Sequence, residues 1–383
     1  MKFIHLSDLH LGKRVGEFSM TEDQAHALRQ VLAVVDEEKP DAVLLAGDVY
    51  DKGVPSLEAV RLLDYFLTEL VKRRVPVAVI SGNHDSPDRL EFLSQVLRDR
   101  GVLIAGTPCL PLQTLTLNDE HGPVDIVLLP FIKPALVRSL FSEDPPADYS
   151  GAVARMLSTL PPKTGRRVLV AHQFVTAAGQ QPLASDSETV SIGGVDNVDA
   201  SVFDGFDYVA LGHIHRPQPM GRETVRYGGS LLKYSFSEAE QQKGVTIAEL
   251  HADGACTIRF TPLVPLHDMR ELRGPLHALL SPEIADAGNK NDYLSVTLTD
   301  EEELLDPIGS LRAVYPNLMK LQYDNRRTAA EGAEGLTQEE LDAGTGPREL
   351  FCEFFEKQNG AAPDAEQERL LEEIWDRIGG DKL

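Results

Sequence analysis

The sequence is poor in cysteine. Among its 383 residues only Cys109, Cys256 and Cys352 are cysteines, and they lie far apart along the chain. Their odd number and the lack of Cys-x-x-Cys spacing argue against a disulfide framework. They also offer no thiolate pair for a soft-metal site. A reducing environment suits such a chain, so we expect a cytoplasmic protein.

Long apolar runs are also missing. No stretch approaches the roughly 20 apolar residues that a membrane-spanning helix needs. Residues 1–6 are not a charged leader followed by an apolar core, so we expect a soluble, unexported protein with no membrane association. Hydrophobic residues still make up 42% of the chain, enough for one large core with a smaller module beside it.

Positive charge is scarce as well. The formal net charge is -23, with 60 acidic against 37 basic side chains. A protein that grips DNA through a broad basic surface would show the opposite balance. Part of the negative charge is concentrated in the last 53 residues, 331–383, which hold 15 acidic and 5 basic side chains. Other carboxylates could be neutralised by bound metal ions.

Short apolar runs recur through the first two hundred positions, bounded by turn residues, and predict buried strands. These runs are Phe3 to Leu6, Ala42 to Ala46, Val77 to Ile80, Asp125 to Leu129, Val168 to Ala171 and Tyr208 to Leu211. Helical patterns lie between them, first from Thr21, where Gln24 stands at capping-box spacing. The others are Ser56 to Arg74, Asp88 to Arg98 and Tyr149 to Leu160. The alternation predicts an α/β sandwich, ending in short strands over 224–261.

After Pro262 the pattern restarts as a small α+β module. Predicted strands are Met269 to Leu272, Leu294 to Leu298 and Leu318 to Tyr323, with a predicted helix from Glu301 to Tyr315. A polar, Gly-rich stretch and two short amphipathic segments follow. The predicted domains are a catalytic domain at 1–265, an α+β cap at 266–325, a linker at 326–347 and a helical tail at 348–383.

Five polar motifs each begin where an apolar strand ends. They are Asp8-Leu9-His10, Gly47-Asp48, Gly82-Asn83-His84-Asp85, Ala171-His172 and Gly212-His213-Ile214-His215. Because carboxyl ends of strands open into crevices, these side chains can converge. Carboxylate and imidazole ligands suit divalent Mn, Fe or Zn. Any one histidine is more often an ordinary core or surface residue, but the five motifs together predict a metal site.

Over the first 215 residues this set resembles the signature of the calcineurin-like metallophosphoesterases. The resemblance implies an α-β-β-α sandwich that hydrolyses phosphate esters with two divalent metal ions. One ion would be held by Asp8, His10, Asp48 and His215, and the other by Asp48, Asn83, His172 and His213. His84 would stand free beside the phosphate as the catalytic residue, donating a proton or a hydrogen bond to the leaving oxygen.

Further stretches resemble SbcD-type nuclease subunits of bacteria. They are His5 to Gly12, Phe206 to His215, Tyr227 to Ser230 and Lys233 to Glu238. At position 51 this chain carries an aspartate, as the bacterial chains do, whereas archaeal and eukaryotic relatives usually carry a histidine there. The resemblance implies an exonuclease on duplex ends and an endonuclease on single strands and hairpins, supported by Mn with Mg, Fe or Zn as alternatives. Such enzymes serve DNA repair, recombination and replication.

The resemblance also implies partners. An SbcC ATPase would supply ATP dependence and bind the apolar residues of the tail, although the same residues could pack on the chain's own domain. These residues are Leu350, Phe351, Phe354, Phe355, Leu370, Leu371, Ile374 and Trp375. A homodimer within a heterotetramer would form through residues 56–74 and 88–98, whose apolar residues could instead be ordinary core. Separately, Lys133, Arg138, Arg216, Arg222, Arg226, Lys233 and Lys243 could line a local basic groove, although plain surface positions are the better expectation for most of them.

Two other functions use the same motifs. One is a phosphomonoesterase or cyclic-nucleotide phosphodiesterase with a small substrate, which gives no reason for a cap and a tail. The other is a scaffold that binds DNA ends without cutting them, which gives no reason for a complete ligand set.

Overall fold

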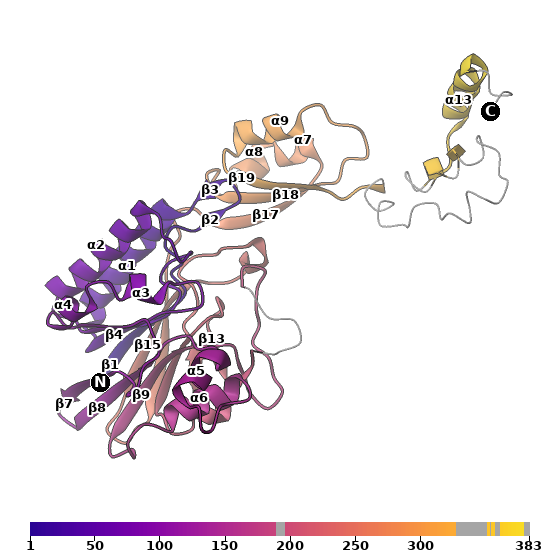
Figure 1. The fold of residues 1–383 in the computed structure, drawn as a ribbon. Helices are drawn as coiled ribbons and strands as arrows, with labels where there is room; N and C mark the ends of the chain where they lie inside the picture. The colour runs from indigo at the N-terminus through magenta and orange to yellow at the C-terminus, as the bar shows by residue number, and fades with distance from the viewer. Residues whose placement is uncertain (189–195, 327–350, 353, 357–360, 379–383) are drawn as a thin grey trace. The chain divides into compact units, whose positions relative to one another are not determined.

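The computed structural model describes residues 1–188, 196–326, 351–352, 354–356 and 361–378 (Figure 1). It divides into two compact units, Met1–Met269 and Arg270–Leu383. Within the described part of the chain, every helix is too short or too polar to cross a lipid bilayer.

Two six-stranded sheets form the middle of the first unit. Their strand orders are β16-β15-β1-β4-β5-β6 and β13-β14-β12-β9-β8-β7. The first sheet comprises β1 (Lys2–Leu6), β4 (Ala42–Ala46), β5 (Val77–Ile80), β6 (Val102–Ala105), β15 (Gly244–Leu250) and β16 (Cys256–Pro262). The second comprises β7 (Thr114–Asp119), β8 (Gly122–Leu129), β9 (Arg166–His172), β12 (Tyr208–Gly212), β13 (Gln218–Met220) and β14 (Arg222–Tyr227). All six strands predicted for this region are confirmed.

Helices cover the outer face of each sheet (Figure 1). The first sheet carries α1 (Thr21–Glu38), α2 (Leu57–Lys72), α3 (Pro87–Leu90) and α4 (Ser94–Arg98). The second carries α5 (Pro134–Leu140), α6 (Tyr149–Leu157) and the short helix η1 (Ala200–Phe203). Small pairs β2 (Arg14–Val15) with β3 (Phe18–Ser19) and β10 (Val175–Thr176) with β11 (Val198–Asp199) lie in loops, as does η2 (Phe236–Glu238). The predicted α-β-β-α sandwich is confirmed.

The strands that precede the five polar motifs are parallel strands of the two sheets. Strands β1, β4, β5 and β6 run parallel, and so do β8, β9, β12 and β14. Their central residues are fully buried, since each sheet is covered on one face by helices and on the other by its partner sheet. The carboxyl ends of β1, β4, β5, β9 and β12 therefore extend directly from the buried core of the fold.

One buried histidine ties the two sheets together below the end of β1. His5 lies on the same face as Phe3, which packs in the layer between the sheets. Its Nε2 is 3.1 Å from the Leu211 carbonyl oxygen, which can only accept, so Nε2 carries the hydrogen. Its Nδ1, 2.9 Å from the Tyr208 hydroxyl, accepts the Tyr208 hydrogen. Burial lowers the pKa of His5 to about 3, so the ring is neutral.

The predicted capping box at the start of α1 is wrong. Thr21 is the first helical residue, and Met20 precedes it without a side-chain cap. The Gln24 side chain is buried and points away from the helix end. Its Nε2 donates to the His10 carbonyl oxygen at 2.7 Å, and its Oε1 accepts from the Gly12 amide at 2.9 Å. Gln24 thus fixes the loop that follows β1.

Three other helix predictions differ from the structure. The helix predicted over 88–98 is divided into α3 and α4, because Leu93 adopts a left-handed conformation with φ 62°. The helix predicted to end at Leu160 stops at Leu157. The helix predicted over 301–315 is α9 (Pro307–Val314), which begins at a proline because proline lacks the N–H that later positions need.

The second unit contains a three-stranded sheet in the order β17-β18-β19. Its strands are β17 (Met269–Gly274), β18 (Tyr293–Leu298) and β19 (Leu318–Tyr323), all of which were predicted. Helices α7 (Leu276–Leu279), α8 (Pro282–Ala285) and α9 pack on the sheet through Leu279, Ala285 and Leu311. A further helix, α13 (Ala365–Ile378), lies in the predicted tail. Nearly all of the predicted linker, and Leu350, lie outside the described residues.

We predict that His5 makes stability depend on pH. The folded state holds this ring neutral down to about pH 3, whereas an unfolded chain protonates it near its ordinary pKa of about 6.5. Stability contributed by the neutral ring is therefore lost as the pH falls below about 6.5, by up to about 1.4 kcal/mol per pH unit.

The measurement is the free energy of unfolding in urea, with EDTA, between about pH 7 and 5, for the wild type and His5→Gln. The stability difference between the two proteins should shrink by about 2 kcal/mol over this range. A difference that stays constant would contradict a neutral, buried His5.

Candidate metal centre

The loops after the strands hold their side chains inward through unusual backbone angles. Asp8, His10, Asp48 and His213 have φ values of 52°, 44°, 46° and 108°. Non-glycine residues rarely adopt positive φ, and the cost is accepted where surrounding structure imposes it, often at functional sites. Here the Asp8 amide donates to the Gly47 carbonyl oxygen at 3.1 Å, and the His10 amide donates to the Asp48 carbonyl oxygen at 2.9 Å.

Two glycines permit the close approach of these loops. A Cβ on Gly82 would lie 2.1 Å from Asp48 Oδ1, and a Cβ on Gly212 would lie 1.8 Å from the Ala46 carbonyl oxygen. Neither position has room for any side chain, so the loops after β4, β5 and β12 meet only because these residues are glycine.

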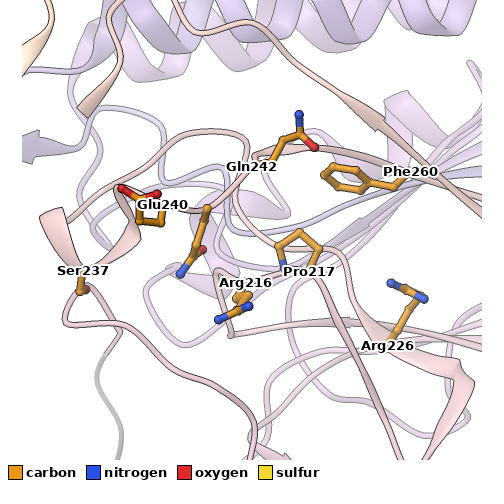
Figure 2. A pocket seen from close by; sticks show the side chains of 8 residues that line it. Arg216, Pro217, Arg226, Ser237, Glu240, Gln242 and Phe260 are labelled. Carbon is orange, nitrogen blue, oxygen red and sulfur yellow. The ribbon is translucent and has the colours of Figure 1, made fainter. Parts of the chain in front are cut away.

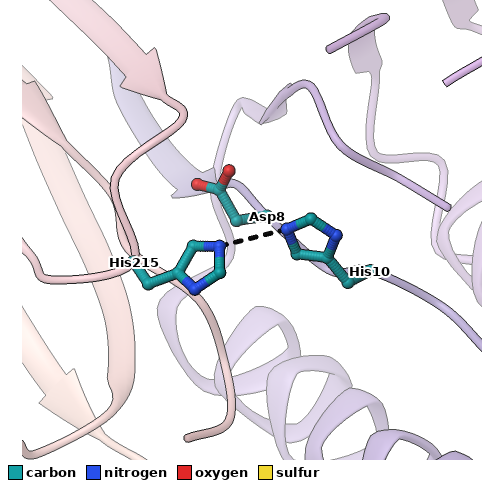
Figure 3. A group of neighbouring side chains, drawn as sticks. All are labelled: Asp8, His10 and His215. Atoms are coloured by element: carbon teal, nitrogen blue, oxygen red, sulfur yellow. Dashed lines mark hydrogen bonds between the residues drawn. The ribbon is translucent and has the colours of Figure 1, made fainter. Parts of the chain in front are cut away.

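Asp8, His10 and His215 form the first group of ligand-type side chains (Figure 3). The Nε2 atoms of His10 and His215 face each other at 3.1 Å, and the Asp8 carboxylate lies beside them. Asp8 Oδ1 accepts from the His213 amide at 2.9 Å. Asp8 Oδ2 is fully buried and has no hydrogen-bond partner among the described residues.

Asn83, His172 and His213 form the second group. Asn83 Oδ1 lies 2.9 Å from His172 Nε2 and 2.9 Å from His213 Nδ1. Asp48 joins the two groups, because its Oδ2 is 3.4 Å from His172 Nε2 and 3.7 Å from His10 Nε2. One carboxylate oxygen thus faces ligand atoms on both sides.

Outer contacts set which ring nitrogen of each histidine faces the cluster. His172 Nδ1 donates to the Ala46 carbonyl oxygen at 2.8 Å, so its Nε2 faces Asp48 and Asn83. His215 Nδ1 is 2.6 Å from the Ser187 hydroxyl, which leaves Nε2 facing His10. Metal-binding histidines are usually oriented in this way by a hydrogen bond at the other nitrogen.

The buried charges of the cluster require a counter-charge. Burial raises the pKa of the Asp8 carboxyl to about 6. Burial would raise the pKa of Asp48 too, but the neighbouring His172 and His10 lower it well below its ordinary value. Burial lowers the pKa of His172, but the nearby Asp48 and Asp8 carboxylates raise it to about 9. The carboxylates therefore attract positive charge to this point.

Divalent metal ions fit these donors. The set combines carboxylate and amide oxygens with imidazole nitrogens and contains no thiolate, as borderline ions such as Mn, Fe and Zn prefer. The described residues provide no hydrogen-bond partner for Asp8 Oδ2, although this atom is buried. Cations held here would supply both its missing contact and the missing charge.

All eight predicted site residues come together in one region. Seven contribute to the two groups described above, and His84 borders them with its ring 4.9 Å from that of His10. His84 is half-buried, its amide donates to Asp48 Oδ1 at 2.9 Å and its Nδ1 donates to the Asp51 carbonyl oxygen at 3.1 Å. Its Nε2 is thereby directed away from the Asp51 loop.

A buried ion pair behind His215 escaped prediction. The Glu238 carboxylate is 2.5 Å from Lys243 Nζ and accepts from the Ser187 hydroxyl at 2.6 Å. Lys243 Nζ also donates to the His215 carbonyl oxygen at 2.8 Å. Glu188 accepts from the His215 amide at 2.6 Å. These residues lie far from the five motifs, so no spacing pattern connects them with the site.

Most of the basic residues assigned to a local groove have structural roles instead. Lys243 is buried in the ion pair, and Lys233 pairs with Asp268 at 2.7 Å. Arg138 donates to the Pro146 and Ala147 carbonyl oxygens. Arg222 likewise donates to backbone carbonyl oxygens, those of Phe203 and Phe206.

Residues 1–217 match the family described as calcineurin-like phosphoesterase. The chain belongs to this family. It is 32% identical over 326 residues to a Staphylococcus epidermidis protein named as the SbcD component of the nuclease SbcCD, a match that covers 84% of this phosphoesterase and 85% of that protein. Both resemblances drawn from the motifs are confirmed. Residues 265–359 match a family described as the type 5 capsule protein repressor C-terminal domain.

Two solved structures are also similar to this phosphoesterase. One is described as GAP50, the anchor in the inner membrane complex of Plasmodium, with 12% identity and a TM-score of 0.41 over 84% of this chain and 96% of that one. The other is TT1561 of Thermus thermophilus, with 12% identity and a TM-score of 0.38 over 68% of this chain and 98% of that one.

We predict that Lys243→Met destabilises the protein by about 3–5 kcal/mol, because it leaves the Glu238 carboxylate buried without its partner. Lys72→Met is the matched control, since Lys72 forms an exposed pair with Glu69 worth less than about 1 kcal/mol. The measurement is urea unfolding in EDTA. The double variant Lys243→Met with Glu238→Leu should regain part of the loss, and equal stability of Lys243→Met and Lys72→Met would contradict the prediction.

Proposed function

We propose that this phosphoesterase is the nuclease subunit of an SbcCD-type complex and hydrolyses phosphodiester bonds in DNA. The observation that carries the proposal is the position of Asp48 between two groups of ligand-type side chains, each complete in its predicted members. The relative named as a component of the nuclease SbcCD supports the choice of DNA as substrate.

Two divalent ions would share the Asp48 carboxylate. Asp8, His10 and His215 would complete one set of ligands, and Asn83, His172 and His213 the other. We propose manganese, the ion that the resemblance to SbcD-type nucleases implies, and the mixture of oxygen donors with imidazole is compatible with it. When bound, such a pair of ions acts as a Lewis acid that activates water and neutralises charge on the phosphate.

His84 would act on the leaving oxygen. Its Nδ1–H donates to the Asp51 carbonyl oxygen, which orients the ring and leaves Nε2 to act as the donor to the oxygen that departs. The bond from the His84 amide to Asp48 Oδ1 fixes the distance between this proton donor and the shared carboxylate. Asp51 therefore positions His84 through its backbone.

The function is tested with purified protein and Mn²⁺ on labelled duplex, single-stranded and hairpin DNA, with p-nitrophenyl phosphate beside them. We expect cleavage of DNA and little of the monoester, and no cleavage by Asp48→Asn. Hydrolysis of the monoester alone would favour a small-substrate enzyme. Binding of DNA ends without cleavage of any substrate would favour the scaffold.

We predict that His84→Ala lowers kcat on DNA by about 10²- to 10⁴-fold, the usual contribution of a positioned proton donor. Bound metal, measured by elemental analysis, should remain at the wild-type level because all seven proposed ligands are unchanged. His121→Ala is the control, since His121 is an exposed residue on the β7–β8 turn. Wild-type kcat with both ions bound would rule out this role.

The SbcC subunit would bind the tail. Phe354 and, on α13, Leu370 and Ile374 are about half exposed, so the described tail keeps apolar side chains available for a partner groove. The predicted contact residues Leu350 and the Trp375 side chain lie outside the described residues. Deletion of residues 345–383 should abolish co-purification with SbcC and leave Mn²⁺-dependent cleavage of single strands; retention of SbcC at full yield would refute tail binding.

A homodimer would form through α2 and the α3–α4 segment. Between these elements lies a hollow of about 1170 Å³ with largely apolar walls, lined by Val60, Leu67 and Leu93 among others. Phe92 and Leu93, which line it, are 72% and 56% exposed, and Val96 on α4 is 63% exposed, more than ordinary core residues would be. Apolar surface of this extent marks a contact site.

We predict that Phe92→Glu with Val96→Glu yields a monomer, because both charges would be buried in the dimer contact. Leu183→Glu is the control, an equally exposed apolar residue on another surface loop. Molar mass from light scattering after gel filtration distinguishes the states. A monomeric wild type, or a dimeric double variant, would exclude this interface.

A further inference from the structure

A hollow of about 370 Å³ lies at the open edge of the sandwich (Figure 2). Its walls come from four segments: the residues that follow His215, strand β14, strand β16, and η2 with the loop that follows it. The lining residues are Arg216, Pro217, Arg226, Ser237, Glu240, Gln241, Gln242 and Phe260. Two arginines, three amide or hydroxyl side chains, one carboxylate, one proline and one aromatic ring therefore line the same space.

The register of the strands explains why Arg226 and Phe260 meet there. Val225 and Tyr227 pack in the outer core of the second sheet, so Arg226 points into the layer between the sheets. Ile258 packs towards that layer from the first sheet, and Phe260 is two residues further along the same strand. At this edge the apolar layer between the sheets therefore ends at the Arg226 guanidinium and the Phe260 ring, where aliphatic side chains would otherwise be expected.

Arg226 is held in place by an ion pair, but one of its hydrogen-bond donors has no acceptor. The residue is 9% exposed, and its Nη1 pairs with Glu223. Its Nε is buried and has no hydrogen-bond partner among the residues that the structure describes. Buried donors without acceptors are rare and costly, so an acceptor supplied by a ligand would be favoured here.

The hollow adjoins the metal centre through residues that are neighbours in the chain. Arg216 directly follows His215, so their Cα atoms are about 3.8 Å apart. Ser237 directly precedes Glu238, which holds His215 through Ser187. A polymer whose phosphate lay at the metal centre would therefore pass close to this space.

We propose that this hollow binds one nucleotide of the substrate strand, next to the cleaved bond. Its phosphate would accept hydrogen bonds from Arg216 and Arg226, its base would lie against the Phe260 ring, and Gln241 and Gln242 would meet polar base edges. The volume is that of a small-ligand site, large enough for one nucleotide. This inference rests on the proposed nuclease function and adds the site that would distinguish a polynucleotide from a small diester.

The first test is binding without catalysis. Fluorescence anisotropy of a labelled ten-residue oligodeoxyadenylate is measured in EDTA for the wild type and four variants. Arg216→Gln and Phe260→Leu alter partly exposed walls and should weaken binding about tenfold each. Arg226→Gln should do the same, with circular dichroism as the check of its fold. Arg29→Gln, an exposed arginine on α1, should bind like the wild type.

The second test separates substrates. With Mn²⁺, Arg216→Gln, Phe260→Leu and Arg226→Gln should show about tenfold higher KM for the oligonucleotide and an unchanged rate on bis(p-nitrophenyl) phosphate, because none of them changes a proposed metal ligand or His84. If Arg216→Gln and Phe260→Leu bind and cleave the oligonucleotide like a DNA-cleaving wild type, the hollow is not a nucleotide site and the nuclease function stands. If the wild type hydrolyses only the small diester, the nuclease function itself fails, and this inference with it.

Discussion

The need of buried carboxylates for positive charge is the constraint on which the rest of this structure depends. Asp8 and Asp48 lie almost completely buried beside five imidazole rings. Without cations, protons must supply the charge, as the raised pKa values of Asp8 and His172 indicate. Divalent ions can do so with a fixed geometry, which is why left-handed backbone and close glycine contacts are tolerated around the same residues.

Support for the site extends outwards in polar layers into the sandwich. The Ala46 and Asp51 carbonyl oxygens orient His172 and His84, while Glu238 and Lys243 hold His215 from behind. In each layer, hydrogen bonds take the place of apolar packing. Each buried polar group there needs a partner, because an unpaired polar group in a low-dielectric interior lowers the stability of the fold. Site precision is therefore linked to stability: removing one distant partner would loosen ligands that it does not touch.

The sequence predicted the parts of this arrangement that depend on simple periodicities. Parallel strands covered on both faces are continuous apolar runs, so β4 and β5 were predicted at their observed bounds, and polar residues after such strands meet by topology. Helix ends were predicted less well, since Gln24 serves the loop after β1 and Leu93 adopts a conformation that no propensity indicates. Lys243 was predicted to lie at the surface, but the structure buries it against Glu238. No local sequence pattern indicates that contact.

The net charge of the whole chain does not predict whether a particular site on it can bind phosphate. At physiological salt, charges further apart than about 8 Å are largely screened, so a total of -23 does not decide what happens inside a cleft. Cations at Asp48 would reverse the local sign, and Arg216 would extend that positive region along the chain. Because Arg226 is anchored in the sandwich, its charge is already oriented before a ligand arrives, which lowers the entropic cost of binding. An acidic protein can thus select a polyanion through a few fixed charges.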